Sequence, residues 1–332
     1  MEKKEKSRYI SSIKVIATIC VVFVHSENLL GYASYTDENT LIYFFSIFSS
    51  AGVPLFFAAA GYLLFRSECS WRQNTKKKIR SLVIPFLFWN TVWLAFDVIG
   101  ECILPAYFNV QFTNNIYSFI DIYFGIPFYT SPHYVPLWFV RDLFILNLAA
   151  PLFQSVLRFQ QPVVLCFLCI IWLLPIPSYF SAAVVFFALG GVLAKKPICI
   201  SNRAARGIFA ITTVAILIAV VVPGRNTSFM FRQILTLIAV ISVSTGLLTI
   251  QETSVLKIMV NLLPYSLPIY LLHGKLLSVM QILYVKLIPT SGISITVGYL
   301  AMPVIIVVVT SAIAKVMQYL MPRIYRISIG YR

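Results

Sequence analysis

The chain has 332 residues, of which 59% are hydrophobic and only 11% are charged, and its mean hydropathy is +0.87. So little polar surface cannot cover a water-soluble globule, which excludes the soluble protein classes. The net charge of +15 is concentrated in loops between apolar segments. We therefore interpret it as a signal of membrane topology and not as a nucleic-acid-binding surface.

The apolar stretches predict an all-α, polytopic membrane protein with about ten transmembrane helices. The predicted segments lie at about 10–30, 41–65, 81–104, 136–157, 162–176, 180–195, 207–223, 230–250, 261–287 and 292–320. The fifth and sixth segments are short for spanning helices, so they form either a re-entrant pair or two tilted spans.

Lys and Arg residues gather in alternate loops, chiefly at 1–8, 66–80, 195–206 and 323–332. The positive-inside rule therefore predicts that both termini lie in the cytoplasm. We expect residues 1–332 to form a single integral-membrane domain, with no appended soluble domain. The multi-pass topology predicts a location in the cell (plasma) membrane.

In the first segment, Lys14 and His25 lie at the two ends of a ten-residue apolar run. Their separation corresponds to a rise of about 16 Å and about three helical turns, so both side chains face the same side. Ionisable groups in membrane helices mark functional sites by default. The structural alternative is that Lys14 snorkels to one interface and His25 anchors the other. Because the apolar run is short, we also expect other helices to cover this one.

His25 is the candidate general base. A neutral imidazole accepts a proton from a hydroxyl group, which is the step that activates an alcohol for acyl transfer. Glu27 is the candidate to orient His25. Residues two apart do not face each other on a helix, so that role requires the helix to end near Ser26.

Further polar residues extend the candidate site. The basic run ending in Lys78 and Arg80 is typical of topology signals and of lipid-headgroup binding, and these last two members are also candidates to bind phosphate groups. Arg141 and Asp142, which follow Trp138, either hold a polar acceptor or form an internal ion pair that fixes helix packing.

In the ninth segment, Tyr270 and His273 are candidates to line a cavity. The alternative for His273 is a buried core residue whose hydrogen bonds are satisfied. His133 is expected to be a solvated loop residue and is not a catalytic candidate. The pair Cys166 and Cys169 lies in an apolar run without nearby His or carboxylate ligands, which favours packing. No zinc, nucleotide-loop or serine-hydrolase signature is found in the sequence, so we expect no bound metal.

Five blocks of the sequence, taken in order, resemble the acyltransferase type 3 family and together cover nearly the whole chain. The blocks are Lys14 with His25, Gly52-Val53-Pro54-Leu55-Phe56-Phe57 with Gly61, Arg80 with Pro85 and Trp89, Leu137-Trp138-Phe139, and Ile269-Tyr270-Leu271-Leu272-His273. The family often has Arg where this chain has Lys14, and Asp where it has Ser11. Lysine keeps the positive charge but lacks the bidentate fork of arginine.

The resemblance implies a membrane O-acyltransferase that moves an acyl group, most often acetyl, from cytoplasmic acyl-CoA to a hydroxyl of a surface or lipid-linked glycan. It implies that His25 is essential and that Lys14 helps to bind the donor. Acetyl-CoA is then a co-substrate, and no cofactor is permanently bound. Direct transfer and a covalent acyl-enzyme both stay open. The expected partners are membrane lipids and the glycan acceptor, without nucleic acid and with no oligomeric state assigned.

Two other classes of function stay open at the level of the sequence. A transporter or flippase for a lipid-linked sugar would also need polar groups inside the membrane. A non-catalytic membrane assembly subunit would bind neither CoA nor glycan. Acyl-CoA-dependent transfer by the purified protein separates the enzyme from both alternatives.

Overall fold

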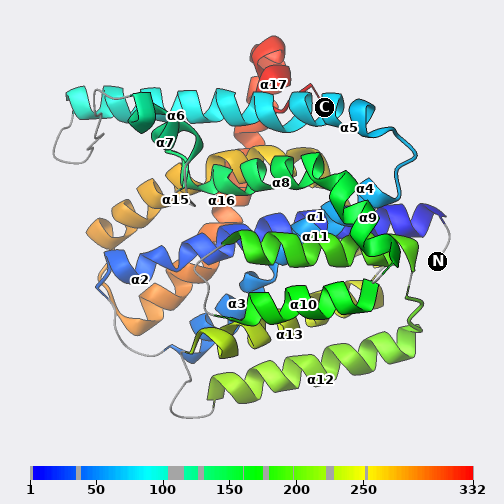
Figure 1. Ribbon diagram of the computed structural model, residues 1–332. Helices are drawn as coiled ribbons and strands as arrows, with labels where there is room; N and C mark the ends of the chain where they lie inside the picture. The colour runs from blue at the N-terminus through cyan, green and yellow to red at the C-terminus, as the bar shows by residue number, and fades with distance from the viewer. Residues whose placement is uncertain are drawn as a thin grey trace. The chain divides into compact units, whose positions relative to one another are not determined.

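In the computed structural model of the chain, all regular secondary structure in the described part is helical, without a β-strand there (Figure 1). The described residues are 3–34, 39–103, 116–125, 131–159, 161–174, 179–196, 198–221, 228–250 and 253–331. The stretch between the third and fourth predicted segments therefore lies partly outside the described residues.

Among the described residues, seven helical stretches are long and apolar enough to cross a membrane. These are Ser7–Tyr32, Thr40–Phe65, Trp71–Ile103, Asn202–Val221, Phe229–Thr249, Ser254–Leu287 and Gly292–Leu320. The two predicted short segments form shorter apolar helices, Pro162–Leu173 and Ala182–Lys195. The multi-pass, all-helical fold is thus confirmed. The count of ten spans and the cytoplasmic termini stay predictions.

The fourth predicted segment is broken in two. Val135–Leu148 and Ala150–Val156 meet at an angle of 58°, and they count as one span only if the bent pair crosses the membrane together. Pro151 lies just after the break. Its ring clashes with the preceding turn and it has no N–H to donate, which kinks or breaks a helix.

The chain divides into two compact units. The first consists of Met1–Arg66, Val156–Pro177 and Ser181–Ile313. Its helices are α1 (Lys3–Ser26), α2 (Asn28–Tyr32), α3 (Thr40–Ser50), α4 (Gly52–Phe65), α10 (Gln161–Leu173), most of α11 (Tyr179–Lys195), α12 (Asn202–Val221), α13 (Phe229–Thr249), α14 (Ser254–Asn261), the 3-10 turn Leu263–Tyr265, α15 (Ser266–Leu287) and most of α16 (Gly292–Leu320).

The second unit consists of Ser67–Ser155, Ser178–Phe180 and Ala314–Arg332. It contains α5 (Trp71–Lys78), a π-helical turn (Ile79–Val83), α6 (Ile84–Ile103), α7 (Ile116–Phe124), the 3-10 turn Val135–Leu137, α8 (Trp138–Leu148), most of α9 (Ala150–Phe159) and α17 (Pro322–Ser328). The prediction of one domain over the whole chain stays a prediction.

Helix α1 is the central element of the first unit, because it packs against α3, α4, α13, α14 and α15. Half of its apolar window is buried, which is the largest share among the seven long stretches. This confirms that other helices cover the segment that carries Lys14 and His25. The core beside it is formed by Val22, Leu29, Ile42, Ile269, Leu277, Ile295, Tyr299, Met302 and Ile306.

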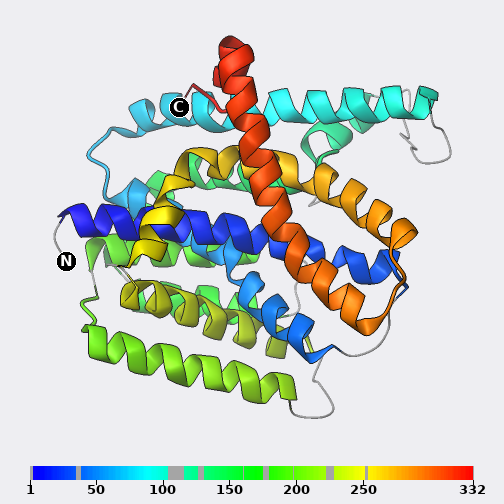
Figure 2. The same cartoon turned by 180° about the vertical axis from the view of Figure 1, so that it is seen from behind.

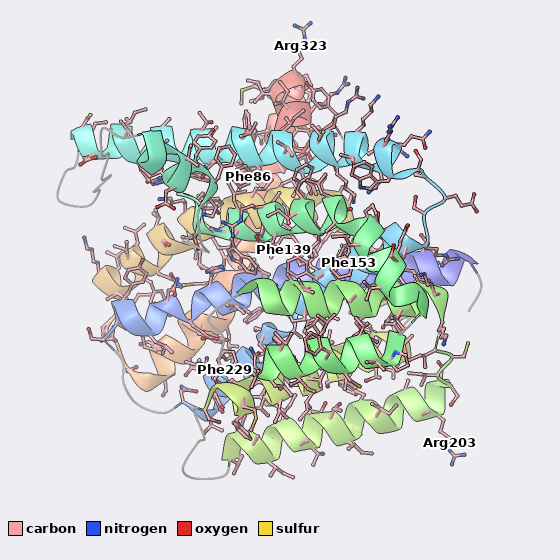
Figure 3. The ribbon with its side chains drawn as sticks, in the orientation of Figure 1. Phe86, Phe139, Phe153, Arg203, Phe229 and Arg323 are labelled. Carbon is pink, nitrogen blue, oxygen red and sulfur yellow. The ribbon has the colours of Figure 1, made fainter. Side chains whose placement is uncertain are left out.

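Glycines let α4 approach its neighbours closely. A Cβ atom on Gly61 would lie 2.1 Å from the carbonyl oxygen of Phe187 on α11, and one on Gly190 would lie 2.0 Å from that of Ala58. Small residues at such contacts allow backbones to pack directly in membrane proteins. In the same unit, α12 and α13 lie side by side (Figures 1 and 2). Arg203 projects outward from the first turn of α12 (Figure 3).

Candidate active site

Lys14 and His25 lie on one uninterrupted helix, as the sequence predicts, since α1 runs from Lys3 to Ser26. The helix tolerates polar residues because their hydroxyl groups donate to carbonyl oxygens one turn earlier. Thr18 donates to Lys14 at 2.9 Å, and Ser26 donates to Val22 at 3.0 Å. Such bonds satisfy hydroxyl groups within an apolar helix. Both candidate residues are half-buried.

The helix ends immediately after His25. Helix α1 stops at Ser26, Glu27 forms a turn, and α2 begins at Asn28. The break falls in the polar run Ser26-Glu27-Asn28, where the apolar sequence of the helix ends. The condition that the sequence set for Glu27, a helix end near Ser26, is therefore met.

The carboxylate of Glu27 nevertheless has other neighbours than His25. It contacts Ser46 on α3 and lies within electrostatic reach of Arg232 on α13 and of Tyr299 on α16. Glu27 thus connects the turn after α1 to α3 through Ser46. Its role in orienting His25 stays a prediction.

His273 of α15 is the side chain that lies against His25. Their ring centroids are 5.0 Å apart, with an angle of 52° between the planes. His273 is fully buried, and its Nδ1 lies 2.6 Å from the carbonyl oxygen of Tyr270. Because a carbonyl only accepts, Nδ1 carries the proton, and Nε2 of the neutral ring is an acceptor. Nε2 has no hydrogen-bond partner within the described part of the chain.

Tyr270 extends this group of side chains. Its ring lies 5.7 Å from that of His273 and 6.4 Å, edge-on, from that of Phe56 on α4. The sequence therefore identified two residues, His25 and His273, that the fold brings together from α1 and α15. The ring of His25 is thus half-buried, and the ring of His273 beside it carries a buried acceptor nitrogen.

The basic run of the second unit begins with a well-formed helix start. The Ser70 side chain accepts from the backbone of Gln73, and the Gln73 side chain accepts from Ser70, which is a capping box. Lys78 ends α5, and the exposed Arg80 lies in the π-helical turn Ile79–Val83. Wide turns of this kind are frequent at functional sites.

The C-terminal segment packs on this π-helical turn. The indole N–H of Trp89 donates to the carbonyl oxygen of Ser328 at 2.9 Å. Gly330 has a φ of +74°, and a Cβ atom there would lie 2.4 Å from the carbonyl oxygen of Arg80. The segment also carries Arg323, which points away from α17 into the surroundings (Figure 3).

Arg141 and Asp142 form an ion pair at the start of α8, with Arg141 Nε 2.9 Å from Asp142 Oδ1. Arg141 Nη1 also donates to the carbonyl oxygens of Phe124 and Gly125, at 2.9 and 3.0 Å, at the end of α7. These contacts support the packing alternative, in which the pair fixes α7 against α8. Trp138 is half-buried one turn before the pair.

The sequence reasoning missed a second polar cluster, on α6. Nε2 of His133 lies 2.7 Å from Oδ2 of Asp97, and their side chains are only 18% and 8% exposed. The expectation of a solvated His133 was therefore wrong. Asn90, two turns before Asp97, donates to the Tyr123 carbonyl and accepts from the backbone N–H of Tyr134. The seven-residue spacing of Asn90 and Asp97 in an apolar segment was the available signal.

Gln281 on α15 was also missed. It is fully buried, and its side-chain Nε2 donates to the carbonyl oxygens of His25 and Ser26 at 3.1 and 3.2 Å. A lone glutamine in an apolar stretch, two turns after His273, was the signal. Polar groups inside membrane helices are rare and usually have a specific partner.

Comparison with known proteins agrees with this picture. The model of the family described as an acyltransferase domain matches residues 7–312. A curated relative, the succinoglycan biosynthesis protein ExoH of Rhizobium meliloti (strain 1021), is 22% identical over 201 residues. The match covers 57% of this chain and 54% of that relative, so the chain spans about half the length of the relative that it matches. No solved structure matches the chain significantly. Because the family model spans nearly the whole sequence, the chain belongs to the acyltransferase domain family, as the resemblance implied.

Proposed function

We propose that the protein is a cell-membrane O-acyltransferase that moves an acetyl group from acetyl-CoA to a hydroxyl of a surface or lipid-linked glycan, with His25 as general base. The family supports acyl transfer by a multi-pass membrane protein. The single observation that carries the assignment of the base is the half-buried imidazole of His25 against the buried imidazole of His273.

The proposed reaction is one acyl transfer with balanced proton movement. An imidazole nitrogen of His25 takes the proton of the acceptor hydroxyl as its oxygen attacks the thioester carbonyl. The carbon–sulfur bond breaks, and the imidazolium returns its proton to the leaving thiolate to give free CoA. A variant with an acetyl group held transiently on His25 uses the same residue as the nucleophile.

His273 is proposed to assist His25 through its acceptor nitrogen. The bond to the Tyr270 carbonyl fixes the Nδ1 proton, so the lone pair of Nε2 is available in the neutral ring. When His25 is protonated, both of its nitrogens donate, and a neighbouring acceptor stabilises that form. A direct contact or one bridging water is compatible with rings whose centroids are 5.0 Å apart.

Two groups of basic side chains, one in each unit and considered separately, are proposed as candidate ligands for the donor phosphates. Lys14 lies about three turns from His25 on α1, a separation of about 16 Å that suits an extended pantetheine arm. In the second unit, Lys78 and Arg80 supply positive charge at the junction of α5 and the π-helical turn. Lysine and arginine are the residues that bind phosphate groups in proteins.

A glycan is the proposed acceptor because the curated relative is a protein of succinoglycan biosynthesis. Trp138 is proposed to contact the acceptor through its half-buried ring. Arg141 and Asp142 are proposed to shape that region indirectly, since Arg141 is engaged by Asp142 and by the end of α7.

The proposal is tested with protein purified into lipid nanodiscs, acetyl-CoA and a surface-glycan fraction from cells that lack the protein. We expect release of free CoA that depends on added glycan, and a glycan product heavier by one acetyl group in mass spectrometry. A transporter would move the glycan across a liposome membrane without changing its mass. Unchanged glycan together with such movement would overturn the proposal in favour of a flippase.

A further inference from the structure

Helix α1 ends inside the first unit, and the end of a helix leaves backbone carbonyls without partners. The last four carbonyl groups of an α-helix receive no intrahelical hydrogen bond. At this end, the carbonyl of Val24 accepts from the backbone N–H of Glu27 at 3.3 Å. The carbonyls of His25 and Ser26 accept from Nε2 of Gln281. The residue that carries the imidazole of the proposed base is therefore held by a side chain from another helix.

The amide orientation of Gln281 follows from its partners. A carbonyl oxygen only accepts, so the group that faces two carbonyls must be the NH₂ end, whose two hydrogens serve one carbonyl each. The side chain is fully buried, and its Oε1 has no hydrogen-bond partner in the described part of the chain. Apolar packing alone would have been satisfied by leucine or methionine. The glutamine is explained by the two carbonyls that it serves.

The same helix also supplies the ring that lies against His25. His273 and Gln281 are two turns apart on α15, and they contact the imidazole and the backbone of His25 respectively. Movement of α1 relative to α15 would therefore disturb both contacts together. A small displacement of a catalytic group has a large kinetic effect, because reacting atoms must meet within a few tenths of an ångström.

We infer that Gln281 is a positioning residue, which fixes the broken end of α1 so that the imidazole of His25 is held against His273 for proton transfer. This inference deepens the proposed function and rests on it for its kinetic consequence. The structural part, that Gln281 determines the setting of His25, is independent of turnover.

The test compares Gln281→Met with Ser278→Ala. Methionine has nearly the same shape as glutamine but no donor for the two carbonyls. Ser278 is a neighbouring residue of α15 whose hydroxyl donates to Gly274 within its own helix, so its loss is the matched control. We expect Gln281→Met to lower kcat by about 10- to 100-fold while the KM for acetyl-CoA changes by less than about two-fold. Ser278→Ala should change neither constant.

A spectroscopic measurement separates this inference from the proposed function. The chain has only three histidines, so nuclear magnetic resonance of isotope-labelled histidine resolves each ring, with substitution of His25 and of His133 in turn assigning the signals. In Gln281→Met the His25 signal should shift, and the His133 signal should stay. The shift is expected even if acetyl transfer is not the activity.

Two outcomes decide the inference. An unchanged His25 signal in Gln281→Met, with kcat equal to that of Ser278→Ala, would overturn it. If Gln281→Met does not yield folded protein, Gln281→Leu replaces it, because leucine is also apolar and has no donor for the two carbonyls. The same His25 shift is expected in that variant, and its absence would equally refute the positioning role.

Discussion

Replacing Gly52 with alanine tests how tightly α1 is held by α4. A Cβ atom at this position would lie 2.8 Å from Cβ of Cys20 and 3.0 Å from the carbonyl oxygen of Ala17, both on α1. Carbon atoms in ordinary contact are about 3.5–4.0 Å apart, so the two helices must separate by about 1 Å. The crowding atom on Cys20 is Cβ itself, which cannot rotate out of the way.

The expected loss of stability is about 1–3 kcal/mol, the usual consequence of adding a methyl group to a packed core. Cys20 lies little more than one turn before His25, so the separation also moves the proposed base. A misplacement of about 1 Å is expected to lower turnover by about 100-fold. Thermal unfolding in detergent measures the first effect, and labelled acetyl transfer measures the second.

Gly207→Ala is the matched control, because nothing lies within 4 Å of a Cβ atom placed on that residue of α12. Alanine is the better helix former by about 1 kcal/mol, so this variant should be as stable as the original protein or more stable. Cys20→Gly in the Gly52→Ala background removes the crowding Cβ and should recover part of the loss, whereas Cys20→Ala should not. The reasoning is refuted if Gly52→Ala matches Gly207→Ala in both stability and turnover.

Three further predictions concern the charged and C-terminal regions. Lys14→Gln should raise the KM for acetyl-CoA by about 10-fold through loss of one charged contact, whereas the KM of Lys14→Arg should stay within about three-fold of the original value. If the KM of Lys14→Gln equals that of Lys14→Arg and of the original protein, Lys14 does not bind the donor. Gly330→Ala should destabilise the docked C-terminal segment by about 1–3 kcal/mol and raise the KM for acetyl-CoA, because the residue has a φ of +74° and an added Cβ atom would crowd the carbonyl oxygen of Arg80. Limited proteolysis of the C-terminus measures this effect, and an unchanged cleavage rate would contradict it. Hydrogen bonds from Ser67 and Lys77 lower the pKa of the exposed Cys69 thiol, so the thiolate is populated at a lower pH than in an ordinary cysteine. The alkylation rate of Cys69 should therefore rise at a lower pH than that of a free thiol, Lys77→Met should move this rise to higher pH, and coinciding profiles of the two proteins would argue against the contact.

The positions of the helices along the chain were predictable from the sequence, because the lipid bilayer restricts what can span it. Every spanning segment must be long, apolar and helical, so hydropathy locates it. The ten predicted segments all fall on helices, and the two short ones are short in the structure. The bend before Pro151 was foreseeable from the same rules, although the prediction treated 136–157 as one segment.

The candidate site was predictable only in part. Lys14 and His25 share a helix, so their relation follows from helical geometry alone. His25 and His273 were each candidates as polar residues in apolar segments, but they are far apart in sequence, and nothing in the sequence paired them. Gln281 and the pair of His133 with Asp97 escaped prediction, because hydrogen bonding to a distant partner leaves no periodic pattern in the sequence. A polar residue in an apolar helix signals that a partner exists but does not identify it.

Transfer of labelled acetyl groups by His25→Ala, compared with the original protein in nanodiscs, tests the central claim most directly. The variant should fold, because His25 is half-buried and the carbonyls at the end of α1 keep their bonds to Gln281. It should still bind acetyl-CoA and should transfer no measurable acetyl group to the glycan. Folded His25→Ala protein that transfers acetyl groups at the original rate would contradict the assignment of His25 as the base.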